Sequence, residues 1–590
     1  MINKKIADIF QEIADILEIQ DENVFRIRSY QKAALTIGNL ASDLEEMHKK
    51  NPKSIKEISG IGEDLYNKIV EIIKTGKCEM HQNLLEHFPP GLLDMLRLRG
   101  IGPKKVKLLY TNLGVKDLKE LEKAAMAGKV RDLPGMGEKS EREILKSIDD
   151  VQRYSKRTPL YDAVQDADEI IKYMKENKFV KRIEYAGSLR RRQETIGDID
   201  ILVCTSHKDN TPKNIKTIMD HFIKYHYTEK ILAHGPTKSS TILESGIQVD
   251  LRVLDEKTYG AALHYFTGSK AHNIKIRDMA KKKGLKVNEY GVFKGSKLVG
   301  GAKEEDVFKA VGLPYIIPEI RNDDGEIEAA LKGELPKSIE LKDIRGDLHM
   351  HTNETDGALD IDTMVKGMYE TGYEYIAITD HSKTSTMVNG LNEKRLLKQM
   401  KKIDDLNKKY KGIAGADNRE FHILKGSEVD ILPDGSLDYS NEILAQMDIF
   451  PASVHSRFNM SEAQMTERII KAMRNPHMKI LGHPTGRLIN RREPYKVDME
   501  AIIDAAIEYG VALELNSQPY RLDLNDMYLR LAKKKGAKIV INTDAHHTSQ
   551  LAYMQYGIYI ARRGWLEKND VLNTLPFEKL FNYWKKNGAK

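Results

Sequence analysis

The feature that most constrains the fold lies in the C-terminal half, where histidines and carboxylates directly follow short apolar runs. From Ile344 onward, such runs alternate with helical stretches about seven times. This alternation is typical of an α/β domain with parallel strands. The C-terminal ends of parallel strands meet at one face of such a domain, so we expect the polar residues behind them to share one site.

The polar residues at these positions are of the types that bind metal ions. In chain order they are His349, His351, Asp356, His381, Glu428, His455, His483, Asp544 and His546. Imidazole combined with carboxylate, without thiolate, suits Zn²⁺, Mn²⁺ or Fe²⁺. A single histidine after a strand is usually structural, but a series of them at successive strand ends predicts a metal-dependent catalytic centre.

Three arginines follow one of these positions. Arg487, Arg491 and Arg492 stand shortly after His483. Two interpretations stay open: contacts to the phosphate of a substrate, which guanidinium groups bind well, or ordinary surface arginines.

The middle of the chain contains three carboxylates in two alternating segments. Asp198 and Asp200 fall on the same face of one predicted strand, and Asp250 lies in a second, at 247–253. Carboxylates this close repel one another unless cations lie between them, and Mg²⁺ is the expected cation because it prefers oxygen ligands. The three together predict a two-metal site for phosphoryl transfer. The alternative is a strand with two solvated acids.

Residues in front of Asp198 support the phosphoryl-transfer interpretation. Gly187 and Ser188 supply a tight turn that can approach a phosphate closely. Arg191 supplies a positive partner for a leaving pyrophosphate.

The first part of the chain repeats a short glycine pattern three times. Each copy has an apolar residue between two glycines, and the pairs are Gly60 and Gly62, Gly100 and Gly102, and Gly135 and Gly137. Such turns expose amide N–H groups at a helix N-terminus, where they bind phosphate without reading a base. Lys104 and Lys105 follow the second copy, so DNA binding should weaken with salt. The alternative is three ordinary helix connections with glycine caps.

Composition narrows the class of protein. At 590 residues the chain is too long for one core, and we expect roughly three to five domains. The net charge of +7 permits a polyanionic partner without requiring one. The only cysteines, Cys78 and Cys204, exclude a disulfide framework or thiolate zinc site and fit a reducing cytosol. No segment resembles a signal peptide or a membrane span, so we expect a soluble, cytoplasmic protein without a membrane partner.

Beyond residue 260 the chain resembles a known family. The run Tyr265-Phe266-Thr267-Gly268-Ser269, followed by Asn273 and Arg277, resembles DNA polymerase beta and its family X relatives when taken with the three aspartates. The resemblance extends from about residue 5 to about residue 300. It covers a lyase-like domain, fingers-type helix-hairpin-helix turns, a palm and a thumb.

This resemblance implies roles for the matched residues. Asp198 and Asp200 would hold both metal ions, Mg²⁺ with Mn²⁺ as the alternative, and Asp250 would hold the catalytic metal and help deprotonate the primer 3′ hydroxyl. Arg277 would contact the template minor groove, and Tyr30 would contact DNA with the glycine turns. The implied nucleotide-binding residues are Gly187, Ser188, Arg191, Tyr265, Phe266, Gly268 and Asn273.

Two N-terminal residues match a second activity of the family. Tyr30 and Lys68 fall where the family's deoxyribose-phosphate lyase has its binding tyrosine and its Schiff-base lysine. A lysine nucleophile needs a pKa depressed by its neighbours or by burial. Two interpretations stay open: a functional lyase with Lys68 as its nucleophile, or a pocket for a DNA-end phosphate without lyase chemistry.

The C-terminal histidines and acids look like those of the PHP (polymerase and histidinol phosphatase) domain, over about 340–575. The resemblance maps all nine residues named above onto the ligands of a trinuclear site that holds Mn²⁺ and/or Zn²⁺. It implies hydrolysis of a phosphoester, and in bacterial family X enzymes a 3′–5′ exonuclease or related 3′-end processing activity.

Together these resemblances imply a multidomain protein of class α+β and α/β that ends in a distorted (β/α)₇ PHP barrel. The expected domains are a helical lyase-like domain at 1–85, a fingers-type helix-hairpin-helix domain at 86–155, a nucleotidyltransferase palm at 156–258, a thumb at 259–313, an extended linker at 314–342 and the PHP domain at 343–590.

The expected function is short-gap filling in DNA repair by a monomer that acts on gapped or nicked double-stranded DNA with dNTPs. The alternative is a PHP-type phosphatase or nuclease whose polymerase core serves only as a DNA-binding scaffold. A third interpretation is a small-molecule phosphatase resembling histidinol phosphatase, fused to such a scaffold.

Overall fold

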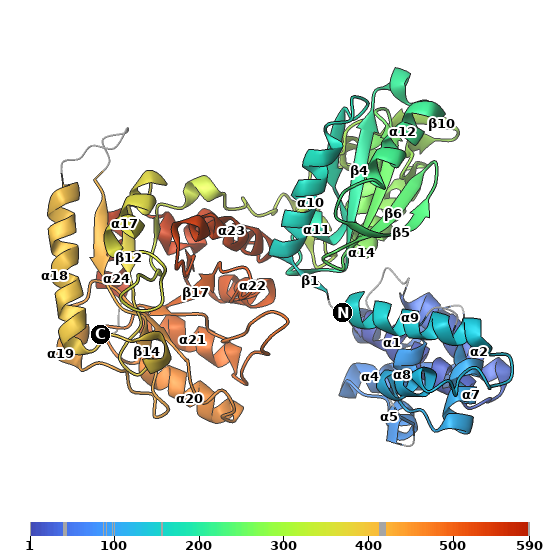
Figure 1. The fold of residues 1–590 in the computed structure, drawn as a ribbon, viewed down its shortest axis with the longest axis horizontal. Coiled ribbons are helices and arrows are strands. Elements are labelled where there is room, and N and C mark those ends of the chain that lie inside the picture. The colour runs from blue at the N-terminus through green and yellow to red at the C-terminus, as the bar shows by residue number, and fades with distance from the viewer. Residues whose placement is uncertain are drawn as a thin grey trace. The chain divides into compact units, whose positions relative to one another are not determined.

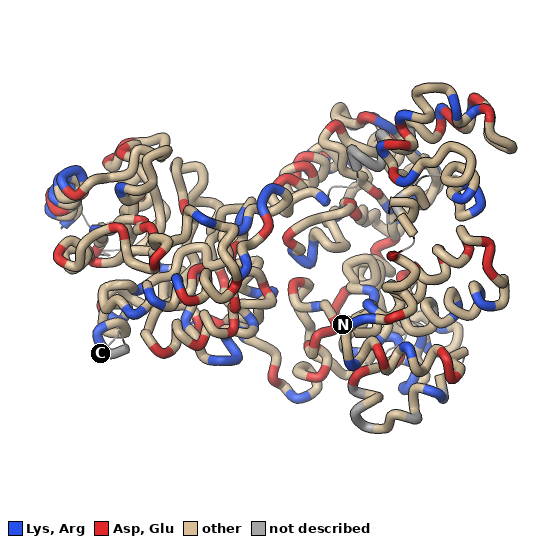
Figure 2. Tube along the Cα trace, turned by 90° about the horizontal axis from the view of Figure 1, so that it is seen from below, with Lys and Arg blue, Asp and Glu red and all other residues tan. Residues whose placement is uncertain are grey.

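The computed structural model describes the chain with a few short gaps. The described residues are 2–38, 44–58, 60–86, 88–89, 91–96, 98, 101–154, 157–411 and 420–587. They divide into two compact units, one of Met1–Arg157 with Asn273–Asp278 and one of Thr158–His272 with Met279–Lys590. Basic and acidic residues are interspersed along the trace (Figure 2).

The first unit is built from helices. They are α1 (Ile2–Ile19), α2 (Val24–Gly38), α3 (Leu44–Lys50), the 3₁₀ turn η1 (Pro52–Glu57), α4 (Glu63–Thr75), α5 (Glu79–Glu86), α6 (Gly91–Met95), α7 (Pro103–Leu113), α8 (Leu118–Met126) and α9 (Glu138–Tyr154). Apolar residues recur every three or four positions in α1, so Ile6, Phe10 and Ile13 share one buried face. Ile16 and Ile19 join a second cluster, built around α7, α8 and α9.

The second unit begins with a five-stranded sheet. Its elements are β1 (Thr158–Pro159), α10 (Leu160–Met174), β2 (Arg182–Tyr185), α11 (Gly187–Arg190), β3 (Thr195–Ile196), β4 (Asp198–Thr205), η2 (His207–Asp209), α12 (Pro212–Phe222), β5 (Thr228–His234), β6 (Lys238–Leu243) and β7 (Gln248–Asp255). The strand order is β2-β4-β7-β6-β5, in which β4 and β7 run parallel (Figure 1).

Alternation along β4 separates core residues from site residues. Ile199 packs in the cluster formed with α10 and α12. Leu202 packs on the other face, against Tyr259. Because side chains alternate between faces, Asp198 and Asp200 share the face of Leu202 and turn away from the core under those helices.

A smaller group of elements follows the sheet, and apart from Asn273–Asp278 in α14 it belongs to the second unit. Its elements are α13 (Tyr259–Thr267), α14 (Lys270–Lys282), β8 (Lys286–Asn288), β9 (Gly291–Lys294), β10 (Lys297–Gly300) and α15 (Glu305–Val311). The three strands form an antiparallel sheet in the order β10-β9-β8.

The segment 314–342 differs from the extended linker that its composition predicts. It contains η3 (Pro318–Ile320), α16 (Glu326–Lys332) and η4 (Leu341–Asp343). Arg321 and Glu326 are fully buried in it. The reason is charge pairing: Arg321 binds Glu304, and Glu326 lies 2.7 Å from Nδ1 of His272. The segment is therefore packed against both of the parts that it connects.

The C-terminal domain combines parallel strands with helices. Its strands are β11 (Gly346–Asp347), β12 (Tyr375–Ile378), β13 (His422–Lys425), β14 (Val429–Asp430), β15 (Pro451–Ser453), β16 (Ile480–Leu481), β17 (Ala512–Asn516) and β18 (Ile539–Asn542). Its helices are α17 (Ile361–Glu370), η5 (Thr386–Val388), α18 (Glu393–Tyr410), α19 (Asn441–Leu444), α20 (Glu462–Met473), α21 (Met499–Tyr509), α22 (Asp526–Lys535), η6 (Thr548–Tyr553), α23 (Met554–Arg563), η7 (Lys568–Asp570), η8 (Leu572–Thr574) and α24 (Phe577–Asn587).

The strands form two parallel sheets, β11-β12-β13 and β14-β15-β16-β17-β18. Single bridges between Met350 and Ala545, and between His381 and Glu428, connect the two sheets. Helices α18, α20, α21 and α22 lie on the outside of the strands (Figure 1). The α+β and α/β organisation is confirmed, and closure into a seven-stranded barrel stays a prediction. No helix in the described part of the chain combines the length and apolarity needed to span a bilayer.

Candidate active sites

The three palm carboxylates lie side by side at the start of two neighbouring strands. Strand pairing sets Asp200 directly across from Asp250. One carboxylate oxygen each from Asp198, Asp200 and Asp250 lie within 4.8 Å of one another. This is a set of oxygen donors that fits divalent cations.

The charges of this site are unbalanced in the protein alone. Burial, together with the charges of Asp198 and Asp250, raises the pKa of Asp200 to about 7. The pKa of Asp250 is shifted in the opposite direction to that of Asp200, because Lys238 on β6 and Gln248 contact its two carboxylate oxygens at 2.5 and 3.0 Å. Burial alone would raise the pKa of Asp250, but these contacts hold it below its usual value. The sequence analysis did not identify Lys238. It could be recognised only from its position on β6, the strand that pairs with β7.

Gly187 brings the chain against the carboxylates. Its φ of 61° lies in the left-handed region that favours glycine. A Cβ at this position would lie 2.6 Å from Oδ2 of Asp200. Ser188, the next residue of α11, is partly exposed. The predicted phosphate-binding turn and the metal-binding carboxylates are therefore in contact.

A buried ion-pair network holds this turn in place. Arg190 donates two hydrogen bonds of 2.8 Å to Glu304, and Arg321 donates one of 2.5 Å to the same carboxylate. Burial would raise the pKa of Glu304, but the two guanidinium groups hold it far below its usual value. Arg191 donates to the backbone oxygen of Thr267. The end of α11 is thereby tied to the end of α13.

The residues predicted to bind the nucleotide lie around the end of α13. The rings of Tyr265 and Phe266 meet edge to face, 5.2 Å apart, and the Arg252 guanidinium lies 4.6 Å from the Phe266 ring. Gly268 has a φ of 66°, and a Cβ there would lie 3.2 Å from Nη1 of Arg191. Two further predicted contacts lie on α14, namely Asn273 and Arg277.

In the C-terminal domain, the predicted metal ligands lie next to strand ends. His349 and His351 follow β11, with Asp356 in the loop beyond them. His381 follows β12, and Glu428 lies between the end of β13 and the start of β14. His455 follows β15, His483 follows β16, and Asp544 and His546 follow β18. Six strand ends thus contribute side chains to one region, as the alternation of strands and helices predicts.

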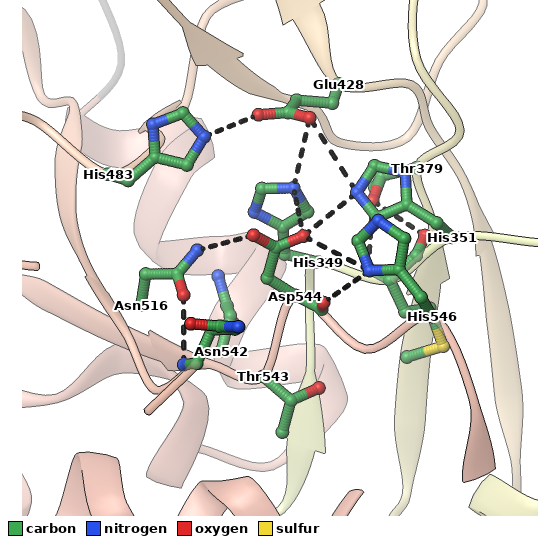
Figure 3. Close-up of polar contacts among 12 residues, drawn as sticks. His349, His351, Thr379, Glu428, His483, Asn516, Asn542, Thr543, Asp544 and His546 are labelled. Carbon is green, nitrogen blue, oxygen red and sulfur yellow. Dashed lines mark hydrogen bonds and ion pairs between the residues drawn. The ribbon is translucent and has the colours of Figure 1, made fainter. Parts of the chain in front are cut away.

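These nine side chains converge. Figure 3 shows His349, His351, His483 and His546 around Glu428 and Asp544. Nε2 of His483 lies 2.9 Å from Oε1 of Glu428. Three groups have ligand atoms within 4.8 Å of one another: His351, Asp356, His381 and His546; His349, His351 and Asp544; and His381, Glu428 and His455.

Buried ring nitrogens in this site face carboxylates without forming hydrogen bonds. Nε2 of His349 and both ring nitrogens of His351 have no hydrogen-bond partner within the described ranges. Yet Nε2 of His351 lies only 3.1 Å from Oδ1 of Asp544. Buried polar atoms are normally satisfied. Imidazole nitrogens that face carboxylates without bonding to them are arranged to share a cation, so the residues present fit divalent metal ions.

The pKa values of the histidines also fit the binding of divalent metal ions. Burial, with His546 and His381 close by, lowers the pKa of His351 to about 3, so its ring is neutral, the form that binds metals. Burial also opposes protonation of His381, but Glu428 and Asp356 outweigh it and raise the pKa of His381 to about 10. At such a position a metal ion would displace a proton.

Two supporting carboxylates were missed from the sequence. Glu514, buried in β17, lies 2.8 Å from Nδ1 of His349 and accepts a hydrogen bond of 2.8 Å from the backbone N–H of His483. Asp430 lies 2.5 Å from Nδ1 of His455. Such partners orient a ring so that its other nitrogen faces the metal. The signal for Glu514 is a carboxylate inside an otherwise apolar run.

Arg487, for which a phosphate contact and a surface position both stayed open, is paired within the protein. Its guanidinium donates two hydrogen bonds, of 3.0 and 2.6 Å, to Glu194 of the palm. Arg491 lies 5.0 Å from the Tyr520 ring, and Arg492 donates to the backbone oxygen of Gly486. The strong, partly buried pairing of Arg487 thus occupies its guanidinium within the protein.

The glycine turns of the first unit differ in charge. A Cβ at Gly62, Gly102, Gly135 or Gly137 would meet nothing within 4 Å, and Gly60 has a φ of 92° beside Lys32. Helices α4 and α9 begin with acids, whereas α7 begins with Pro103, Lys104 and Lys105. The turn before α7 therefore offers the best approach to a phosphate. Gly100 lies outside the described residues.

Lys68 lines a cavity of about 530 Å³ together with Arg26. Its ammonium group pairs with Asp64. Burial opposes protonation, but Asp64 and Tyr30 outweigh it and hold the pKa of Lys68 above its usual value. Tyr30 is buried and donates to the sulfur of Met80. A lysine held protonated is a poor nucleophile. The lyase and the pocket for a DNA-end phosphate both stay predictions.

Comparison with protein families divides the chain into known domains. Family models match a "Helix-hairpin-helix domain" at 1–78, a "SAM-like Helix-hairpin-helix tandem" at 92–150, a "DNA polymerase beta palm" at 157–243, a "DNA polymerase beta thumb" at 262–322 and a "PHP domain" at 347–518.

Individual relatives cover the whole chain or one half of it. The DNA polymerase/3′-5′ exonuclease PolX of Bacillus subtilis (strain 168) is 38% identical, over 100% of both chains. A probable phosphatase of Thermoanaerobacter sp. (strain X514) is 28% identical, over 41% of this chain and 96% of its own length. DNA polymerase lambda of Arabidopsis thaliana is 25% identical, over 54% of this chain and 62% of its own length.

Proposed function

Because the chain belongs to the family X DNA polymerases that carry a C-terminal PHP domain with 3′–5′ exonuclease activity, we propose that it extends and shortens DNA 3′ ends at two separate metal sites. The observation that carries this proposal is the convergence of two sets of metal-competent side chains. One is the three carboxylates of the palm, and the other is eight residues of the PHP domain, of which Glu428 also contacts His483.

In the palm, Asp198, Asp200 and Asp250 are the proposed ligands of two Mg²⁺ ions, with Mn²⁺ as the alternative. Bound cations would stabilise the developing charge of nucleotidyl transfer. Asp250 accepts the proton of the primer 3′ hydroxyl. Ser188 and Arg191 bind the β and γ phosphates at the turn that Gly187 allows, and the pyrophosphate leaves from there.

Around the incoming nucleotide, Tyr265 and Phe266 support the sugar, and Gly268 leaves room for the Arg191 guanidinium beside them. Asn273 contacts the nucleotide, and Arg277 the template. DNA is held by backbone contacts at the glycine turns, of which the turn at Gly102 is the strongest candidate because Lys104 and Lys105 follow it.

In the PHP domain, the nine ligands are proposed to hold Mn²⁺, Zn²⁺ or both. Bound metals would activate water for attack on the terminal phosphodiester. Glu514 and Asp430 contact Nδ1 of His349 and His455, which leaves Nε2 of each ring as the nitrogen that would bind a metal.

The proposed substrates are gapped or nicked duplexes and dNTPs, used by a monomer in the cytoplasm during DNA repair. The alternative in which the palm only docks DNA is less consistent with its carboxylates. A docking surface for a polyanion does not need three adjacent acids, one of which has a pKa raised to about 7.

The test uses a one-nucleotide-gapped duplex labelled at the primer 5′ end, with dNTPs and Mg²⁺ or Mn²⁺. Wild type is compared with Asp198→Ala plus Asp200→Ala and with His349→Ala plus His351→Ala. We expect only the aspartate variant to lose extension, and only the histidine variant to lose 3′ shortening. If wild type extends the primer with neither metal, the palm is a DNA-docking module instead.

A further inference from the structure

An arginine that no motif singled out lies at the PHP metal site. Nε of Arg521 lies 3.5 Å from Oδ2 of Asp544. Within the described ranges, no other lysine or arginine lies within 4.0 Å of the carboxylate ligands Asp356, Glu428 and Asp544. Nη1 of Arg521 is buried and has no hydrogen-bond partner in the described part of the chain. A buried guanidinium normally bonds through its donors, so this one is poised for an anionic oxygen.

The loop that carries Arg521 is held by a second arginine. This loop leaves β17 and is closed by a bridge between Asn516 and Asp523. Arg487 donates from Nε to the backbone oxygen of Arg521 at 2.9 Å, and from Nη2 to the backbone oxygen of Leu522. Arg487 thus fixes the stretch of backbone from which the Arg521 side chain extends toward Asp544.

Arg487 is in turn held from the palm. Glu194 accepts both of its other hydrogen bonds, and the side chains of Arg487 and Glu194 are only 13% and 23% exposed. Glu194 immediately precedes β3, and its backbone oxygen accepts from the N–H of Leu160 at the pairing of β1 with β3. A bidentate pair with little access to water is among the stronger interactions a surface loop can make. Glu194, Arg487 and Arg521 therefore form a continuous chain of contacts from the palm to Asp544.

We propose that Arg521 contacts a phosphate oxygen of the DNA 3′ end in the PHP site, and that Glu194 of the palm is a positioning residue for it, acting through Arg487. This inference rests on the proposed 3′-shortening function. It adds that 3′ shortening depends on a residue of the palm, which two separate sites would not require. The polymerase half completes the phosphate-binding side of the exonuclease site. Loss of Glu194 weakens 3′ shortening although this residue touches neither metal ligands nor substrate.

The first experiment measures steady-state 3′ shortening of a 5′-labelled single-stranded oligonucleotide by the full-length protein with Mn²⁺. Arg521→Gln is expected to lower kcat/KM by about tenfold to a hundredfold, as loss of a charge-assisted hydrogen bond does. Glu194→Gln is expected to lower it by about tenfold, the usual size for a residue that orients another. Mn²⁺ bound per protein, measured by calorimetric titration, stays at the wild-type value in both variants.

The matched control is Asp162→Asn. Asp162 is also an acid of the palm that contacts the C-terminal domain, because its Oδ1 accepts a hydrogen bond of 2.8 Å from the Tyr520 hydroxyl. An asparagine can still accept this bond, and the change leaves Glu194 and Arg487 in place. We expect shortening within about twofold of wild type, since isolated surface changes have small effects.

A double-mutant cycle tests the route. If Glu194 acts through Arg521, Glu194→Gln has no further effect on kcat/KM in the Arg521→Gln background. Fully additive losses would overturn the positioning role.

An Arg521→Gln variant that shortens DNA at the wild-type rate would overturn the phosphate contact. Shortening that survives His349→Ala plus His351→Ala would overturn the proposed function itself, and with it this inference. Primer extension by Arg521→Gln at the wild-type rate shows that the fold is intact.

Discussion

At the scale of single residues, both candidate sites use backbone conformations that bring the chain close to carboxylates. Gly187 does so without strain in the palm. In the PHP domain, two predicted ligands that are not glycine adopt positive φ values, 23° for His483 and 54° for Asp544. Such conformations cost on the order of 1–3 kcal/mol each and persist where the surroundings enforce them, typically at functional sites. The strain at His483 and Asp544 agrees with a role for both in binding metal.

Gly187 allows a sharp test at this scale. Gly187→Ala is expected to lower primer extension by about a hundredfold, because its Cβ would collide with Asp200 and displace a metal ligand. The measurement is single-nucleotide incorporation on gapped DNA with Mg²⁺.

Gly295→Ala is the matched control. Gly295 has the same φ of 61°, but a Cβ there would meet nothing within 4 Å. Both alanines impose the same backbone strain, so a difference between them reports the contact with Asp200. Equal losses of incorporation in the two variants would contradict the proposed role of Gly187.

At the scale of elements, the palm shows what sequence reasoning can reach. Period-two alternation is local, so it placed Asp198 and Asp200 on one face and Asp250 in a second strand. The pairing of the two strands, with Asp200 opposite Asp250, comes from the structure. The network that fixes α11 was out of reach, because Arg190 and Glu304 are 114 positions apart. Neither residue belongs to a periodic pattern, and only the packing of α13 against both α11 and α15 brings them together.

Glu304 should be among the residues on which stability depends most. Glu304→Gln leaves Arg321 buried without a charged partner, so we expect the free energy of unfolding to fall by about 3–5 kcal/mol at pH 7. The folded pKa of Glu304 lies below its ordinary value of 4.5. Its contribution is therefore complete above that pH and is lost as the pH falls toward the folded pKa, so the difference from wild type should shrink below about pH 4.

Urea unfolding of both proteins from about pH 8 down to about pH 2 measures this difference on both sides of the ordinary pKa, with Glu305→Gln as the control. Glu305 is the exposed neighbour on α15, and its substitution should change the free energy of unfolding by no more than about 0.5 kcal/mol. A constant difference between wild type and Glu304→Gln across the whole pH range would contradict the ionic role of Glu304.

At the scale of the whole molecule, local motifs predicted the order of domains that the family models match, and they singled out residues that the structure brings together in two clusters. Each metal ligand stands beside a short apolar run, so its neighbourhood identifies it. The contacts that connect the halves of the second unit have no such signature. Glu194 and Arg487 are 293 positions apart, and each looks like a surface charge in its own surroundings. The burial of 314–342 was missed for the same reason, since charged side chains in a chain segment suggest exposure until their partners are known.

Part of the salt dependence of DNA affinity should come from Lys104 and Lys105. Lys104→Ala plus Lys105→Ala is expected to reduce the slope of log affinity against log salt by about two, roughly 0.9 for each phosphate that a lysine no longer neutralises. Fluorescence anisotropy with a labelled gapped duplex, over a range of KCl concentrations, gives this slope.

The comparison variant is Lys119→Ala plus Lys123→Ala. These two lysines are exposed on α8. Their substitution removes the same charge from the same unit without altering the turn at Gly102. If both double variants change the slope equally, the lysines after Gly102 contribute only general positive charge.

The packed segment 314–342 also determines where the gene for such a chain can be divided. A polymerase half that ended at residue 313 would lose Arg321 and Glu326, and with them the partners of Glu304 and His272. Ending it after Lys332 keeps these pairs but separates Glu319 from Arg562. Recombination that exchanged one half for that of a distant relative would have to carry matching residues across this boundary.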